Sequence, residues 1–394
     1  MVRARTLLLL AVLAALAVAA AIALNWRRAP AVDLGGNAAP LLPELAANVN
    51  AVDRVDLVGA GGDVRVTLRR GASGWTVGQR HGYPADVVAL RGLLLQLAQA
   101  RLAEPKTADP ARYAVLGVED VAQPRAGGVQ VALHGLARPL ALIVGRYDPR
   151  AGGTFARRPG EARSWLAMGD LRVDADPAHW LEREIADIPA ARVREVTLAP
   201  TGGPAFTVYK THRDDSHYSA REIVRRRELA TPYAAEDIAA ALAGLELDDV
   251  YVASVRTPPA GAAPAHARFR TWDGLTVDAD AWRQGGQNFV RLRATAEPAA
   301  EAASPAGTRA AADEAARLNA RWQGWTYCLP AYRYAAFDRR FDSLLRPARE
   351  AGAPAPAASA APAPAASAAP AMPATTAAPA PVPALVLAPS TDGA

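Results

Sequence analysis

The sequence predicts an α+β fold: two tandem similar units, each an antiparallel sheet with a helix packed on one face, after an N-terminal transmembrane helix. Two observations support the tandem units. Short stretches of alternating apolar and polar residues recur along the middle of the chain, which is the pattern of half-buried strands. Their order also occurs twice, first in residues 49–190 and again in residues 191–347. We therefore expect an internal duplication with one helix covering each sheet.

The first unit, residues 49–190, begins with three predicted strands at residues 54–58, 63–69 and 75–77. A helix is predicted from Tyr83-Pro84, since proline is tolerated in a first helical turn. Its apolar stripe has helical spacing and consists of Val87, Leu90, Leu94 and Leu97. Four further strands are expected at residues 129–133, 140–144, 154–156 and 165–167. Residues 180–188 are predicted to close the unit as a short helix.

The second unit, residues 191–347, repeats this order. Its strands are predicted at residues 193–198, 205–210, 217–219, 267–270, 275–279, 289–294 and 325–328. A helix is expected from about Thr231, with Ile238, Ala241, Leu242 and Leu245 on one face. A final helix is expected at about 335–345. Residues 309–322 are mostly good helix formers and predict one more helix.

The N-terminus predicts a membrane anchor. Residues 6–24 carry no charge, and a helix of nineteen residues spans roughly 28 Å, close to the thickness of a bilayer core. We therefore expect residues 1–28 to be a cytoplasmic start followed by a single span. The basic start favours a body on the periplasmic side of a bacterial inner membrane. A cleaved signal peptide is the alternative, because residues 17–21 fit the small-residue cleavage pattern, and it places the body in the same compartment.

Two segments flank the predicted body. Residues 29–48 are rich in Pro, Gly and Ala and are predicted to be a linker. Residues 348–394 are almost entirely Ala, Pro, Ser and Thr, with two copies of Ala-Pro-Ala-Pro-Ala-Ala-Ser. Such a composition cannot bury enough apolar surface to offset the entropy of ordering, so it predicts a disordered, extended tail.

Charge and cysteine content exclude several classes of protein. The net charge is +5, but the 44 basic residues are scattered among 39 acidic ones without a long basic run, which argues against nucleic-acid binding. The single cysteine, Cys328, excludes an internal disulfide and a cysteine-based metal cluster. Because it lies in an apolar strand, we expect a buried thiol. No nucleophile elbow, Ser-x-x-Lys pair or phosphate-binding loop is present, so we predict no catalytic, cofactor or metal residues and no enzymatic activity.

Three groups of residues are nevertheless candidates for binding. Residues 211–217 hold two histidines and two aspartates, which could ligate a divalent metal, although a predicted turn also explains them. Arg225, Arg226 and Arg227 form the densest basic patch and are a candidate surface for an anionic partner. Trp272 and Trp282 lie near the turn of a predicted hairpin and are candidates for exposed ligand-binding or partner-binding residues.

Several short motifs resemble a known family. They are residues 42–50, Gly74-Trp75-Thr76-Val77, 82–86, 104–107, 113–120, Gly145-Arg146, 158–161 and 324–330. Together they resemble family 4340 of the bacterial domains of unknown function, over about residues 41–345. The resemblance implies a single-pass envelope protein, often associated with auxiliary parts of ABC-type export systems similar to those linked with gliding motility. No catalytic residues are established for that family, so none is carried over.

The function expected from these observations is that of a membrane-anchored, extracytoplasmic accessory or scaffold protein, which the resemblance links to an ABC-type export system. Its expected partners are the cytoplasmic membrane, through residues 6–24, and envelope proteins; no nucleic acid and no cofactor is expected. One alternative is a periplasmic module that binds glycan or peptide between the two units. A further alternative is a metal-dependent hydrolase that uses His212 and His217.

Overall fold

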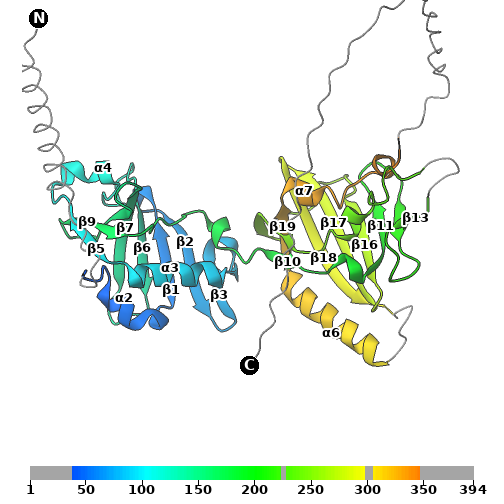
Figure 1. Cartoon of the computed structure of the whole chain (residues 1–394), viewed down its shortest axis with the longest axis horizontal. Helices are drawn as coiled ribbons and strands as arrows, with labels where there is room; N and C mark the ends of the chain where they lie inside the picture. The colour runs from blue at the N-terminus through cyan, green and yellow to red at the C-terminus, as the bar shows by residue number, and fades with distance from the viewer. Residues whose placement is uncertain (1–37, 223–227, 298–304, 347–394) are drawn as a thin grey trace, which may run out of the picture. The chain divides into compact units, whose positions relative to one another are not determined.

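The computed structural model describes residues 38–222, 228–297 and 305–346, all within one compact unit, Met1–Pro347 (Figure 1). These residues form two large antiparallel sheets with few helices, which confirms the predicted α+β class. The predicted span at residues 6–24, the basic patch at residues 225–227 and the whole Ala/Pro tail, residues 348–394, lie outside them. Within the described ranges, no helix is both long and apolar enough to cross a bilayer.

The first sheet has nine strands in the order β4-β3-β2-β1-β6-β7-β8-β9-β5, and every neighbouring pair is antiparallel. In chain order the strands are β1 (Arg54–Val58), β2 (Val64–Gly71), β3 (Gly74–Val77), β4 (Tyr83–Pro84), β5 (Leu102–Pro105), β6 (Val129–His134), β7 (Leu140–Asp148), β8 (Gly153–Arg157) and β9 (Ser164–Met168). The seven strands predicted for this unit are present as β1, β2, β3, β6, β7, β8 and β9, whereas β4 and β5 were not predicted as strands.

Helix α3 (Val87–Gln99) accompanies this sheet and buries the predicted stripe except Val87. It begins later than predicted, because Tyr83–Pro84 pairs with β3 as a strand and Asp86 then caps the helix by accepting the amides of Val88 and Ala89. Helix α2 (Pro43–Asn48) packs on α3, and Leu42 and Leu45 are buried. The folded body therefore begins inside the predicted linker. A short helix, α4 (Tyr113–Leu116), precedes β6.

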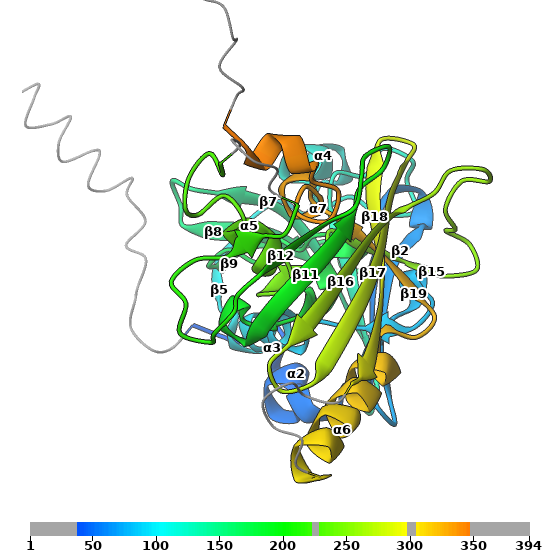
Figure 2. The same ribbon diagram turned by 90° about the vertical axis from the view of Figure 1, so that its right-hand side faces the viewer.

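The second sheet has eight strands in the order β13-β12-β11-β16-β17-β18-β19-β15, again antiparallel throughout (Figure 2). In chain order the strands are β11 (Val193–Ala199), β12 (Phe206–Tyr209), β13 (Ser219–Ala220), β15 (Asp249–Val252), β16 (Ala265–Thr271), β17 (Leu275–Gln284), β18 (Gln287–Ala296) and β19 (Trp325–Leu329). A separate two-stranded ribbon pairs β10 (Glu184–Ala186) with β14 (Leu245–Glu246).

The helices that accompany the second sheet and the ribbon agree less well with the sequence-based predictions. The helix predicted at residues 309–322 is confirmed as α6 (Pro305–Trp322), which packs on β18 and β17. The closing helix predicted at residues 180–188 is wrong: the segment holds the end of a 3-10 turn (Pro177–Trp180) and then β10. Strand β10 pairs with β14, which lies far along the chain, and this pairing makes the segment extended instead of helical. The helix expected from about Thr231 is reduced to α5 (Glu236–Ala239). The final helix predicted at about 335–345 is wrong: α7 (Ala331–Tyr334) ends before this segment, which instead holds turns and a 3-10 helix, Phe341–Leu344.

The two sheets share one strand order. When β4 is set aside, β3-β2-β1-β6-β7-β8-β9-β5 corresponds position by position to β13-β12-β11-β16-β17-β18-β19-β15. Along the chain, a helix follows the first strands of each sheet: α3 comes after β3, and α5 comes after β13. Each helix is followed in the chain by a strand, β5 or β15, that lies at the far edge of its sheet. There, β5 pairs with β9 and β15 pairs with β19.

Side chains from both sheets meet in one hydrophobic core. Tyr83 of β4 is 1% exposed and contacts Trp325 and Tyr327 of β19 edge-on, with ring centroids 5.1 and 6.3 Å away. Beside it, Arg80 forms a two-pronged ion pair with Asp249 of β15 at 2.6 and 2.9 Å. Such a bidentate pair fixes geometry as well as charge. The first sheet therefore meets the second through an aromatic contact and an ion pair.

Candidate functional site

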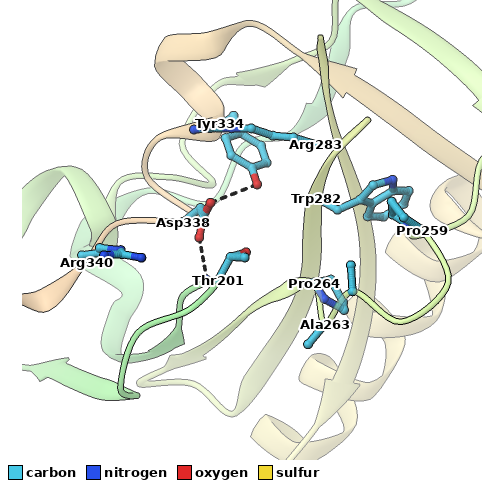
Figure 3. Close-up of a pocket in the computed structure, with 10 residues that line it drawn as sticks. Thr201, Pro259, Ala263, Pro264, Trp282, Arg283, Tyr334, Asp338 and Arg340 are labelled. Atoms are coloured by element: carbon cyan, nitrogen blue, oxygen red, sulfur yellow. Dashed lines mark hydrogen bonds between the residues drawn. The ribbon is translucent and has the colours of Figure 1, made fainter. Parts of the chain in front are cut away.

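An open hollow of about 430 Å³ lies at one end of the second sheet (Figure 3). Its walls come from four parts of the chain: the turn after β11, the loop between β15 and β16, the end of β17, and α7 with the segment after it. The lining residues are Thr201, Pro259, Ala262, Ala263, Pro264, Trp282, Arg283, Tyr334, Asp338 and Arg340.

Trp282 forms one wall. Successive residues of a strand point to opposite faces, so Trp282 and Arg283 project from opposite sides of β17, as Figure 3 shows. Trp282 lies directly opposite Phe289 of β18, with ring centroids 5.8 Å apart, and the Arg291 guanidinium lies 5.3 Å above its ring. The side chain is 3% exposed, and among the described residues its indole Nε1 has no hydrogen-bond partner.

Asp338 organises the other wall. Its carboxylate accepts hydrogen bonds from the Thr201 backbone amide at 2.7 Å and from the Tyr334 hydroxyl at 3.2 Å (Figure 3). Burial, and then the Asp338 charge, raise the pKa of Tyr334 to about 12, so the phenol stays protonated at neutral pH and remains a donor. The guanidinium of Arg283 stacks 4.8 Å from the Tyr334 ring.

The chemistry of the hollow is that of a binding surface with mixed character. The rings of Trp282 and Tyr334 are almost fully buried, so the accessible apolar area comes from the proline rings and from the small side chains of Ala262 and Ala263. Arg283 and Arg340 are exposed at its rim and supply guanidinium donors. A few polar groups placed around apolar walls are typical of sites that fix the orientation of a ligand.

The structure corrects the expectation for the two candidate tryptophans. Trp272 and Trp282 are each only 3% exposed, so the expected exposed aromatic surface is wrong. Trp272 is covered by the Arg194 guanidinium, 5.6 Å from its ring. Trp282 is covered by Phe289, by Arg291 and by the loop that carries Pro259. Only Trp282 lines the hollow. The structure does not describe the basic patch, Arg225, Arg226 and Arg227.

The histidine segment forms a turn region between β12 and β13, as expected. Asp215 accepts hydrogen bonds from the backbone amides of Thr211 and His212, both at 2.8 Å, and these bonds hold the pKa of its carboxyl below the usual value. His217 instead lies 3.4 Å from Glu236 and meets the Tyr233 ring edge-on. The two histidines thus face different carboxylates. In the described ranges, no three His, Cys, Asp or Glu side chains are placed to hold a metal ion.

Cys328 is buried beside the hollow, as predicted, in a small cluster with Trp282, Phe289 and Tyr251. Burial raises the pKa of its thiol to about 11. Since the thiolate is the reactive form, the thiol should be inert at pH 8 as long as the second sheet is folded.

This gives a direct prediction. A thiol-specific reagent at pH 8 is expected to leave the native protein unmodified and to react with one thiol per chain in denaturant, because Cys328 is the only cysteine. Intact-mass spectrometry measures both states. A Cys328→Ser, Ala316→Cys variant, with its thiol on the exposed face of α6, should react at once and serves as the positive control. Full labelling of the native wild-type protein would contradict the burial described here.

Comparison with known proteins identifies a family over part of the chain. Residues 75–265 match the model of a family described as "Domain of unknown function (DUF4340)". This match confirms the resemblance to family 4340 over residues 75–265. The curated proteins and the solved structures gave no significant match. The matched DUF4340 segment runs from β3 to the first residue of β16, so it includes the loop that carries Pro259 and Pro264 but ends before Trp282.

Within the DUF4340 segment, two of the motifs that carry the resemblance, residues 113–120 and 158–161, meet at Arg157 of β8. Arg157 is 3% exposed; it donates to the carbonyl oxygens of Val118 at 2.7 Å and Glu161 at 3.0 Å, and to the Asp120 carboxylate at 2.7 Å. Its guanidinium also lies 4.5 Å from the Tyr113 ring. These contacts give residues 113–120 and 158–161 of the DUF4340 domain a role in packing and positioning.

Sequence reasoning missed most of the hollow. It singled out Trp282 but not Thr201, Arg283, Tyr334 or Asp338. These side chains come from separate segments and have no characteristic spacing, so no local pattern in the sequence could have joined them.

Proposed function

We propose that the protein is a non-enzymatic binding module that recognises extended peptide segments of protein partners and acts as an accessory or scaffold subunit. The observation that carries this proposal is the hollow, whose proline and alanine side chains and guanidinium rim suit a peptide. A peptide backbone offers carbonyl acceptors to those donors, and its side chains can cover the apolar walls.

The location and the class of partner form a second part of the proposal. Residues 6–24 tether the body to the periplasmic side of a bacterial inner membrane, and the partners are envelope proteins, such as subunits of an ABC-type export system. The uncharged run at residues 6–24 supports the tether. The resemblance to family 4340 supports the class of partner, and no contact within the described residues bears on it.

We also infer that the body is a tandem duplication of one sheet-and-helix unit. The shared order of eight strands supports this inference, as does a matching detail of the register. In the first sheet Thr67 pairs with Asp56 and donates to its carboxylate at 2.9 Å. In the second sheet Thr207 pairs with Thr197, and their hydroxyls lie 3.2 Å apart. The hollow would then be an addition that distinguishes the second unit from the first.

The peptide alternative is favoured over the glycan alternative for one reason. A carbohydrate platform needs exposed aromatic faces, and the two tryptophans that suggested one are buried. The hydrolase alternative needed His212 and His217 to converge, and they face different carboxylates.

A crosslinking pull-down from native membranes tests the proposed function. Ala263 is exposed and lines the hollow, so Ala263→Trp should fill the hollow without removing any core contact. We expect the tagged wild-type protein to recover an envelope protein at near-stoichiometric yield and Ala263→Trp to recover at least tenfold less by quantitative mass spectrometry.

Ala316→Trp is the matched control, because it adds the same ring to an exposed alanine of α6 that does not line the hollow. It should behave as the wild type. Equal recovery by both tryptophan variants would show that partners bind elsewhere, and recovery of no protein by the wild type would remove the basis for a scaffold.

A further inference from the structure

Two exposed arginines line the rim of the hollow. Arg283 lies at the end of β17, and Arg340 lies in the segment after α7 (Figure 3). Arginines elsewhere on this sheet are paired with acids: Arg268 and Arg270 of β16 each have a carboxylate oxygen at 2.7 Å. Within the part of the chain that the structure describes, Arg283 contacts a tyrosine ring and Arg340 contacts a backbone carbonyl, and neither forms an ion pair.

The contacts that these arginines do make hold them in place and leave donors free. The Arg283 guanidinium stacks 4.8 Å from the centre of the Tyr334 ring, and stacking uses the flat face of the group rather than the N–H groups at its edge. Arg340 donates from Nη2 to the Gly202 carbonyl oxygen at 3.3 Å, which occupies one of its several donors. Side chains that are ordered before a ligand arrives lose less entropy on binding.

The charge balance of the hollow is positive. Among its lining residues only Asp338 carries a carboxylate, and this group already accepts the Thr201 amide at 2.7 Å and the Tyr334 hydroxyl at 3.2 Å. The lining therefore holds two positive charges and one negative charge, a net charge of +1. An acidic side chain at the rim is attracted to both guanidinium groups, whereas a basic one is repelled by them.

The rest of the accessible lining discriminates little between peptides. It consists of the half-buried rings of Pro259 and Pro264 and the exposed methyl groups of Ala262 and Ala263, which can be covered by many kinds of side chain. A guanidinium is more selective, because its planar fork of donors matches the two oxygens of a carboxylate. Selection among extended segments therefore depends on the two rim arginines.

We propose that the hollow selects extended peptide segments that carry Asp or Glu side chains, whose carboxylates pair with Arg283 and Arg340. This rests on the proposed function, in which the hollow binds extended peptides, and it names the chemistry of the segment. Small or apolar side chains of the partner cover the proline rings and the alanine methyl groups, and its acidic side chains lie at the rim.

Selection from a random octapeptide library tests the proposal. Beads that display the library are incubated with the tagged full-length protein in detergent, and the retained peptides are sequenced. We expect Asp and Glu to be enriched at least threefold over the starting library. A retained peptide is then labelled with a fluorophore, and exchange of its Asp and Glu for Asn and Gln should weaken binding at least tenfold by fluorescence anisotropy, because the exchange keeps the shape and removes the charge.

Charge reversal at the rim connects the preference to the hollow. The double variant Arg283→Glu, Arg340→Glu changes the net charge of the lining from +1 to −3 and should retain peptides enriched in Lys and Arg instead. A reversed preference requires a folded hollow, so it cannot result from unfolding. Arg309→Glu, Arg317→Glu is the matched control, because it makes the same change of charge at two exposed positions of α6. It should keep the acidic preference of the wild type.

The outcomes separate this proposal from the proposed function. Ala263→Trp fills the hollow and should abolish retention of the selected peptides. Retained peptides without enrichment of Asp and Glu, lost in Ala263→Trp, would overturn the acidic preference while the proposed function stands. If Ala263→Trp lowers the retention of no peptide, both are overturned. An acidic preference that persists in the double rim variant would assign it to another surface and overturn the role of Arg283 and Arg340.

Discussion

Gly128→Ala is expected to lower the free energy of unfolding by about 3 kcal/mol or more, at the upper end for overpacking. A methyl group at this position would overlap the Gly117 carbonyl oxygen and lie 2.8 Å from the Val144 carbonyl oxygen. Both atoms belong to the backbone of packed elements, and Gly128 directly precedes β6, so no flexible side chain can move aside. Urea unfolding of the detergent-solubilised protein, followed by circular dichroism, measures the change.

The neighbouring glycine is a matched control. A methyl group at Gly127 would meet its nearest atom, the Gly117 Cα, at 3.6 Å, which is ordinary van der Waals contact. Gly127→Ala should therefore change the free energy of unfolding by less than about 1 kcal/mol. Equal stability of the two alanine variants would mean that the close approach of residue 128 to residue 117 does not exist in solution.

Trp322→Ala is expected to cost about 3–5 kcal/mol, the range for removing a large buried aromatic side chain. Trp322 is 2% exposed near the end of α6, and its indole Nε1 donates to the Ile185 carbonyl oxygen of β10 at 2.9 Å. One side chain thus joins the helix of the second sheet to the β10–β14 ribbon. Urea unfolding again reports the loss.

Two further variants separate the causes of that loss. Trp322→Phe keeps most of the ring but removes the donor, so it should cost less than Trp322→Ala and still exceed the roughly 1 kcal/mol typical of one hydrogen bond, because the carbonyl stays buried. Arg317→Ala changes an exposed position of the same helix and should stay within about 0.5 kcal/mol of the wild type. A small effect of Trp322→Ala, comparable to that of Arg317→Ala, would show that α6 does not depend on this contact.

The sequence predicted the elements whose signal is local. Strand β16 alternates between buried and half-buried residues along its whole length, and α6 is built of good helix formers, so both were predicted close to their observed positions. Strands β5 and β15 were missed. Each is four residues long and gains its stability from a partner far along the chain, β9 or β19, and this pairing leaves no periodic pattern in so short a segment.

The candidate site shows the same limit. Trp282 was singled out because it lies near a hairpin turn, but it is buried there, since the loop after β15 closes over it. Asp338 and Thr201 are 137 residues apart in the chain and are joined by one hydrogen bond. Such convergence depends on tertiary structure, so the sequence alone could supply one residue of the hollow and not its architecture.

The edge strands that return late also set the order in which the protein can fold. Leu102 of β5 pairs with Ala167 of β9, and Asp249 of β15 pairs with Cys328 of β19, so each pairing waits for a strand made much later. Pairings of such long sequence separation are slow to form. As the chain emerges from N- to C-terminus, β9 and then β19 complete their sheets last. Until then each sheet exposes an unpaired edge, which is a template for aggregation and a binding site for a chaperone.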